Sequence, residues 1–150
     1  MMAVEIKTLV FPTDFSEFSA AALPWARRLA DDLDASIHCV YVVEEPHIYS
    51  TLDLGPVNLP TLAELAESAK ERLNKFVEEH LQGLGHSTVA KVLTGRPADE
   101  IVAYSRDAEA AIIVMTTHGY SGVKQVLLGS TTEEVLRHAD CPVMAVRTVT

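Results

Sequence analysis

A glycine-bearing stretch, Met115–Glu134, follows an apolar run whose length and β-branched content are typical of a strand buried on both faces. The stretch turns at Gly119 and closes on Gly129 and Ser130, at the head of a predicted helix. A helix N-terminus has unpaired N–H groups and a partial positive charge, and glycine lets the backbone approach an anion closely. A strand, a glycine loop and a helix start in this order therefore predict a cradle for the phosphates of a nucleotide.

The predicted phosphate cradle cannot by itself supply the binding free energy that a nucleotide requires. A helix terminus alone contributes about 0.3–1 kcal/mol to a nearby anion, whereas micromolar affinity needs about 8 kcal/mol. Several backbone N–H groups and a pocket for the base must supply the difference. Asp14, directly after the apolar run Thr8–Phe11, is a candidate acceptor for a ribose hydroxyl, and the main chain at Val42–Val43 is a candidate reader of an adenine edge.

Each candidate also has a purely structural interpretation. Asp14 stands at capping-box spacing from Glu17, so it would serve equally as the N-cap of the first helix. Ser130 and Glu133 have the same spacing, which would occupy the Ser130 hydroxyl. Gly119 and Gly129 would simply allow a positive φ in the backbone, and Val42 would simply end a strand.

Catalytic signatures are absent from the sequence. It has no Walker phosphate loop, no dinucleotide fingerprint, no nucleophile elbow and no histidine pair at metal-ligand spacing. His118 lies beside the glycine loop without a partner at catalytic spacing, so we expect it to be packed or solvent-facing. The residues therefore predict binding and assign no catalytic group.

The composition of the chain argues against nucleic-acid and membrane partners. Twelve basic and twenty-one acidic residues give a net charge of −9, which argues against nucleic acid because that partner calls for a clustered basic face. Cys39 and Cys141 are predicted to be small buried hydrophobes without a disulfide. No signal-peptide layout or membrane-length apolar run is present, so we expect one cytoplasmic domain over residues 1–150 and no membrane partner.

Strand and helix patterns alternate along the chain, which predicts an α/β fold with an open, mostly parallel sheet of five strands and helices on both faces. The predicted strands are Thr8–Phe11, Ser36–Val43, Thr88–Leu93 (more polar, hence near an edge), Ile112–Met115 and Pro142–Arg147. The predicted helices start near Phe18, at the capping box Thr61–Glu64, after Gly95-Arg96-Pro97, and at Ser130. Residues 44–60 are predicted to be a long loop. Ligands of such sheets bind at the carboxyl ends of the strands, where Asp14 and Thr116–Gly119 would meet across one crevice.

Four segments make the chain similar to the universal stress proteins of the UspA type, over essentially the whole length. They are Thr8–Ser16, Gly95–Ile101, His118–Ser130 and Val135–Val143. The nucleotide-binding signature of that family is Gly, two residues, Gly, nine residues, Gly, and then Ser or Thr. Gly119, Gly129 and Ser130 match its last three fixed positions, while the first glycine is replaced by Thr116.

The resemblance implies an adenine-nucleotide-binding site and a role for each matching residue. Asp14 would meet the ribose, the Val42 backbone the adenine, and the remaining members the phosphates: Gly119, Gly129, Ser130 and Thr131. The flanking residues of the implied site are Pro12, Thr13, Met115, Thr116 and His118. The family further implies ATP or another adenine nucleotide, a divalent ion such as Mg²⁺ or Mn²⁺ on its phosphates, and a homodimer through the last strand, Val143–Val146.

Three hypotheses follow for function. The first is a dimeric adenine-nucleotide-binding protein that acts as a stress-response sensor or regulator. The second is a protein-interaction module of the same fold without nucleotide affinity, because a β-branched Thr116 would crowd the ligand unless its hydroxyl adds a hydrogen bond. The third is a weak, metal-dependent ATPase that uses Asp14.

Overall fold

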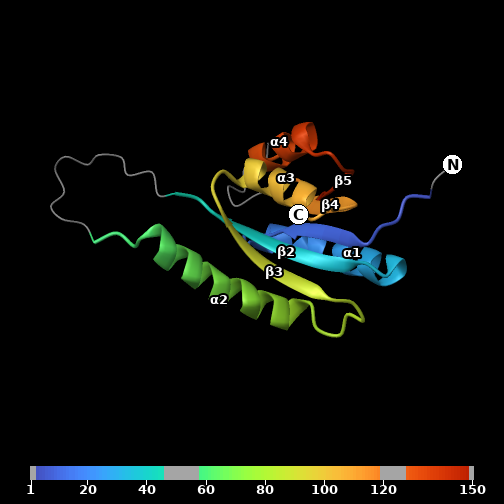
Figure 1. Cartoon of the computed structure of the whole chain (residues 1–150), viewed down its shortest axis with the longest axis horizontal. Helices are drawn as coiled ribbons and strands as arrows, with labels where there is room; N and C mark the ends of the chain where they lie inside the picture. Colours follow the sequence, from blue (N-terminus) through green and yellow to red (C-terminus); the bar gives the residue numbers. More distant parts are fainter. Residues whose placement is uncertain (1–2, 46–57, 119–127, 149–150) are drawn as a thin grey trace.

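The computed structural model describes residues 3–45, 58–118 and 128–148, in which strands and helices alternate (Figure 1). The elements are β1 (Thr8–Pro12), α1 (Glu17–Leu33), β2 (Ser36–Val43), α2 (Leu62–His80), β3 (Thr88–Thr94), α3 (Pro97–Asp107), β4 (Ile112–Thr116), α4 (Ser130–His138) and β5 (Val143–Val146). Each element lies within a few residues of its predicted position. The predicted loop 44–60 falls mostly outside the described residues.

All neighbouring strands are parallel, in the order β3-β2-β1-β4-β5. The predicted sheet is thus confirmed, and β3 lies at an edge as its polar residues indicated. The pairing of β1 with β4 covers only Leu9↔Ile112 and Val10↔Ile113, whereas β1 follows β2 over five residue pairs. The sheet therefore splits between β1 and β4 beyond Val10, which is also where the strand order reverses direction.

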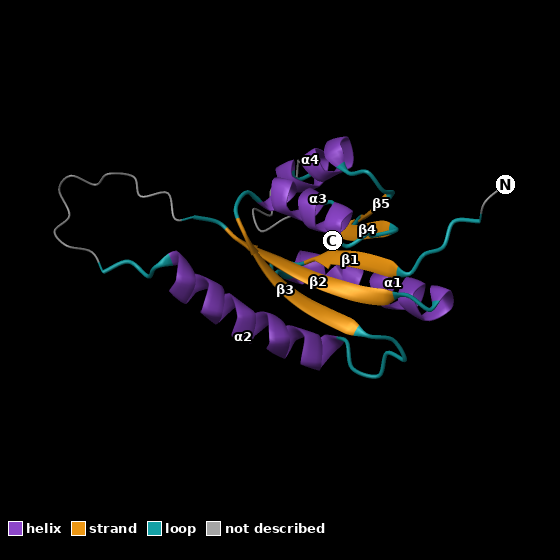
Figure 2. Cartoon of the chain, viewed as in Figure 1, coloured by secondary structure: helices purple, strands orange, loops and turns teal. Residues whose placement is uncertain are grey.

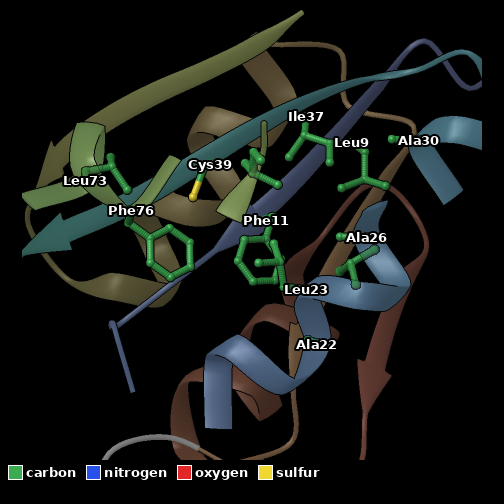
Figure 3. Packing of buried hydrophobic residues seen from close by; sticks show 12 residues of the cluster. Leu9, Phe11, Ala22, Leu23, Ala26, Ala30, Ile37, Cys39, Leu73 and Phe76 are labelled. Carbon is green, nitrogen blue, oxygen red and sulfur yellow. The ribbon is translucent and has the colours of Figure 1, made fainter. Parts of the chain in front are cut away.

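Helices cover both faces of the sheet, with α1 and α2 on one face and α3 and α4 on the other (Figure 2). Alternation along β1 divides the core, because Leu9 and Phe11 point to the α1–α2 side and Val10 to the α3–α4 side. Figure 3 shows Phe11 among α1 side chains such as Leu23. Burying a large apolar side chain stabilises the fold by roughly 1.5–3 kcal/mol.

The start of α1 corrects one prediction. Ser16, not Asp14, is the N-cap, since its Oγ accepts a hydrogen bond from the Ser19 N–H at 3.1 Å. The helix then runs through Pro24 to Leu33. Trp25, which the helical spacing groups with the apolar stripe, is 56% exposed and lies off the buried face.

Other local expectations are confirmed. Thr61 and Glu64 form a complete capping box at the start of α2, and Pro97 is the first residue of α3. Both cysteines are free, but only Cys39 is buried as expected, whereas Cys141 is half-buried. Burial raises the pKa of Cys39 to about 12, so this thiol stays protonated. Within the described part of the chain, every helix is too short or too polar to cross a membrane.

Candidate functional site

A cavity of about 310 Å³ opens where β1, β2 and β4 end, at the split between β1 and β4. Its size suits a small ligand, since such pockets hold roughly 300–1,000 Å³. The described residues that line it are Pro12, Thr13, Asp14, Ser19, Val40, Tyr41, Val42, Glu44, Pro97, Ile101, Met115, Thr116, His118, Gly129, Ser130, Thr131 and Thr132. The cavity is thus built mainly from strand ends and helix starts.

The β1 turn, which we define as Thr13–Ser16, forms one bank of the cavity and is held by its own side chains. Ser19 Oγ donates to Ser16 O at 3.0 Å, so the 2.9 Å bond between the Thr13 and Ser19 hydroxyls must use the Thr13 proton. Thr13 Oγ1 also accepts from the Phe15 N–H at 3.0 Å, and Phe15 has a left-handed φ of 63°. This relay is buried, which fixes the backbone around Asp14.

Asp14 presents one carboxylate oxygen to this turn. Its Oδ1 accepts from the Ser16 N–H at 2.9 Å and from Ser16 Oγ at 2.5 Å. Among the described residues, no hydrogen bond engages Oδ2, and the side chain lines the cavity. Asp14 is therefore a pre-oriented acceptor for a ligand hydroxyl.

Val42 offers main-chain groups to the same cavity. Val40 O accepts from Thr13 N at 2.9 Å, which among the described residues is the last backbone hydrogen bond between β2 and the β1 segment. Residues two apart in a strand point their backbone groups the same way, so Val42 faces the side on which β1 has already ended. Val43 points the other way, and its carbonyl accepts from Gly95 N at 3.0 Å.

The end of β4 forms the opposite bank. Thr116 is 6% exposed, and its hydroxyl donates to the His118 carbonyl at 2.5 Å. His118 is half-buried, with Nδ1 2.9 Å from Thr117 Oγ1 and its ring 6.1 Å from the ring of Phe18. Of the two expected placements, packed or solvent-facing, the structure shows a packed His118, and the Thr116 hydroxyl is occupied by the protein itself.

The α4 start, which we define as Gly129–Thr132, completes the site. Gly129 N donates to Thr117 O at 2.6 Å, and Thr132 Oγ1 donates to Thr116 O at 2.7 Å, so this helix start is tied to β4. The predicted Ser130 capping box is wrong, because the N-cap is Gly129 and no side chain caps the helix. With respect to the described residues, the Ser130 and Thr131 hydroxyls are left available together with the first-turn N–H groups.

The structure gathers ten of the eleven predicted site residues around one cavity, and Gly119 lies outside the described residues. Sequence reasoning missed the α3 contribution, Pro97 and Ile101, although the turn before that helix was recognised. Gly95 makes this turn with a φ of 141°, and an added Cβ would lie 2.8 Å from Glu100 Oε1. That glycine was therefore the available signal that α3 approaches the ends of the strands.

The donors and acceptors in the cavity are suited to binding. It combines two carboxylates, those of Asp14 and Glu44, with main-chain groups, hydroxyls and the apolar side chains of Val40 and Met115. In the described ranges, no three His, Cys, Asp or Glu side chains cluster closely enough to hold a metal ion. A ligand with hydroxyl, aromatic and anionic parts matches these groups.

Comparison with known proteins identifies relatives over nearly the whole chain. Universal stress protein MJ0531 of Methanocaldococcus jannaschii is 33% identical over 141 residues, which cover 94% of this chain and 82% of the relative. Universal stress protein MJ0577 of the same organism is 30% identical over 159 residues, with 97% and 98% coverage. The solved MJ0577 structure superimposes with a TM-score of 0.80 and covers 98% of this chain and 99% of that one.

Two further solved structures share the fold and contain adenine nucleotides. A universal stress protein in complex with cAMP is 22% identical, with a TM-score of 0.65 and coverage of 95% and 98%. The universal stress protein of Archaeoglobus fulgidus in complex with dAMP is 20% identical, with a TM-score of 0.65 and coverage of 93% and 96%. The model of the universal stress protein family matches residues 5–147. The chain therefore belongs to the universal stress protein family.

Proposed function

We propose that the protein binds an adenine nucleotide, such as ATP or AMP, in the cavity between the β1 turn and the α4 start. The observation that carries the proposal is the grouping of a ribose-type acceptor, Asp14, with main-chain groups at Val42 and hydroxyls at Ser130 and Thr131 that have no partner within residues 3–45, 58–118 and 128–148. Adenine nucleotides bound to two relatives of the same fold support it.

In the proposed complex, each bank of the cavity meets a different part of the ligand. The adenine lies against the Val42 backbone, and the ribose donates a hydroxyl proton to Asp14. The phosphates accept hydrogen bonds from Ser130, Thr131 and the first-turn N–H groups of α4. Mg²⁺ or Mn²⁺ accompanies the phosphates. This is recognition without turnover, in a cytoplasmic stress-response sensor or regulator.

The proposed assembly is a homodimer through β5. This strand, Val143–Val146, is at the edge of the sheet and its four apolar residues are only half-buried. An edge strand with open backbone groups readily pairs with another chain unless it is covered. Sedimentation that gives a monomer for the wild type at micromolar concentration would contradict this assembly.

Isothermal calorimetry with ATP and Mg²⁺ tests the nucleotide proposal. We expect Asp14→Asn to weaken binding roughly tenfold, because it removes a charged acceptor yet keeps one oxygen for the Ser16 bonds. Asp140→Asn is the matched control: it removes the same charge outside the cavity and is expected to leave affinity unchanged. Absence of heat for the wild type at millimolar ATP would reject nucleotide binding.

A second candidate, an interaction module without nucleotide affinity, is favoured by one observation: the Thr116 side chain lines the cavity where the family motif has glycine. Two variants separate bulk from hydrogen bonding. Thr116→Gly removes both, whereas Thr116→Val keeps the bulk and removes the bond to His118 O. Nucleotide binding that appears only in Thr116→Gly would establish the second candidate.

A further inference from the structure

A second cavity of about 290 Å³ adjoins the first between the starts of α3 and α4. Its lining residues are Glu44, Arg96, Pro97, Ala98, Ser130, Thr131 and Glu134. Four of them also line the first cavity: Glu44, Pro97, Ser130 and Thr131. The two spaces therefore meet along these four residues, and Ser130 and Thr131 lie at the phosphate end of the proposed nucleotide site.

Each cavity alone is at the lower limit for a small-molecule pocket, which is roughly 300 Å³. A base, a ribose and the first phosphate use the apolar and acceptor groups of the first cavity. Further phosphates are expected to continue past the shared residues, because Asp14 lies at the other end of the first cavity and its carboxylate repels them. The second cavity lies along that path.

Arg96 is the cationic side chain of the second cavity. Its Nη2 lies 3.1 Å from Glu134 Oε2 and 3.3 Å from Glu134 Oε1, and its Nη1 lies 3.4 Å from Asp99 Oδ2. The arginine side chain is 71% exposed, so these ion pairs are hydrated and weak, typically about 0–1 kcal/mol. A phosphate offers the guanidinium a bidentate partner with a higher charge.

We propose that Arg96 exchanges Glu134 for the distal phosphates of a bound nucleotide, and that this makes the site selective for ATP over AMP. The inference rests on the proposed function, because it assigns the polyphosphate tail of the same ligand to the second cavity. Arg96 is then a specificity-determining residue, and the Arg96–Glu134 pair is the resting state of an anion-binding group.

Two carboxylates near Arg96 determine the direction in which each substitution is expected to change ATP affinity. Glu134 competes with phosphate for Arg96, and Glu44 lines the same cavity and repels a phosphate. Neutralising either carboxylate must therefore strengthen ATP binding, whereas neutralising Arg96 must weaken it. If the Arg96–Glu134 pair only braces α3 against α4, both partners will change affinity in the same direction.

The test compares ATP and AMP by calorimetry at fixed Mg²⁺ in the wild type and in Arg96→Gln, Glu134→Gln and Glu44→Gln. We expect Arg96→Gln to weaken ATP about fivefold to tenfold and to change AMP less than about twofold. Glu134→Gln and Glu44→Gln are expected to strengthen ATP about twofold to fivefold. Arg137→Gln is the matched control, since it removes the same charge from an ion pair on α4 outside both cavities.

The outcomes distinguish the two proposals. If the wild type binds neither ATP nor AMP, nucleotide binding itself fails. If both bind and the ATP-to-AMP ratio of Arg96→Gln equals that of Arg137→Gln, the Arg96 inference is overturned while nucleotide binding stands. If Glu134→Gln weakens ATP as Arg96→Gln does, the pair is a structural brace and the inference is likewise overturned.

Discussion

The β1 turn and the α4 start line the same cavity but use similar polar residues in opposite ways. In and next to the β1 turn, the Thr13 hydroxyl bonds that of Ser19, and the Ser16 hydroxyl bonds the Asp14 carboxylate and the Ser19 N–H. At the α4 start, only the Thr132 hydroxyl has a partner among the described residues, and those of Ser130 and Thr131 line the cavity without one. A satisfied network gives rigidity, and unsatisfied exposed groups are left for a ligand. Burial and bonding, rather than residue type, therefore separate structural from binding hydroxyls.

The largest effect is expected from breaking the network of the β1 turn. Thr13→Val removes the acceptor of Phe15 N–H and the donor to Ser19 at a site that is 6% exposed. We expect the free energy of unfolding to fall by about 2–3 kcal/mol, because buried polar partners are left unsatisfied. Urea denaturation measures this. The control is Thr94→Val, an exposed threonine, which should change stability by less than about 0.5 kcal/mol.

Neighbouring threonines of α4 sharpen the comparison. Thr132→Val breaks the buried bond to Thr116 O and should cost about 1–2 kcal/mol of stability. Thr131→Val should leave stability within about 0.5 kcal/mol and weaken ATP binding severalfold. Urea denaturation and calorimetry on both variants would reveal this double dissociation. Equal stability losses would show that the distinction between bonded and available hydroxyls is wrong.

Substitutions at Ser16 and Asp14 test which residue of the β1 turn is the N-cap of α1. Ser16→Ala removes the bond to Ser19 N and should cost about 1 kcal/mol. Asp14→Asn keeps an acceptor for Ser16 N and should cost less. Thermal and urea unfolding of the two variants rank them, and a larger loss for Asp14→Asn would restore the aspartate as the principal cap.

The smallest effect on stability is expected at His38, which lies outside both the β1 turn and the α4 start. Burial lowers the pKa of this imidazole, whose Nδ1 lies 2.9 Å from the Tyr104 hydroxyl. The unfolded chain, with a histidine pKa of about 6.5, then binds more protons than the folded state, so stability falls as the pH drops below about 6.5. His38→Gln should therefore lose less stability than the wild type between pH 7.5 and 5.5. An identical pH dependence in urea denaturation would contradict this.

Apolar periodicity carried most information about the fold. Buried runs such as the β4 sequence identify parallel strands, and the polar residues of β3 indicate its edge position. Helix caps were less predictable, because Asp14 and Ser16 are both good capping residues at nearly the same place. The choice depends on Phe15, whose left-handed φ inserts a turn between them. A bulky aromatic residue gives no local signal for that conformation.

The site was predictable where it follows directly from a strand end. Asp14, Val42 and Thr116 each lie within two residues of the end of β1, β2 or β4, so parallel pairing alone brings them together. Tyr41 and Ile101 were not predictable in this way, since their place in the cavity depends on side-chain direction and on how α3 packs. Such contacts come from tertiary packing, which residue spacing does not encode.

The short pairing between β1 and β4 has a consequence for what an occupied crevice does to the whole molecule. In the described residues, the β1–β4 ladder joins the three-stranded part of the sheet to the β4–β5 part over two residue pairs along this seam, with one further backbone bond from Ala111 N to Thr8 O. A ligand that contacts both the β1 turn and the α4 start spans this seam. Its binding free energy then stabilises the association of the two parts of the sheet. Hydrogen exchange of the backbone amides along the seam is therefore expected to slow when the ligand is bound, because local opening of the sheet becomes rarer.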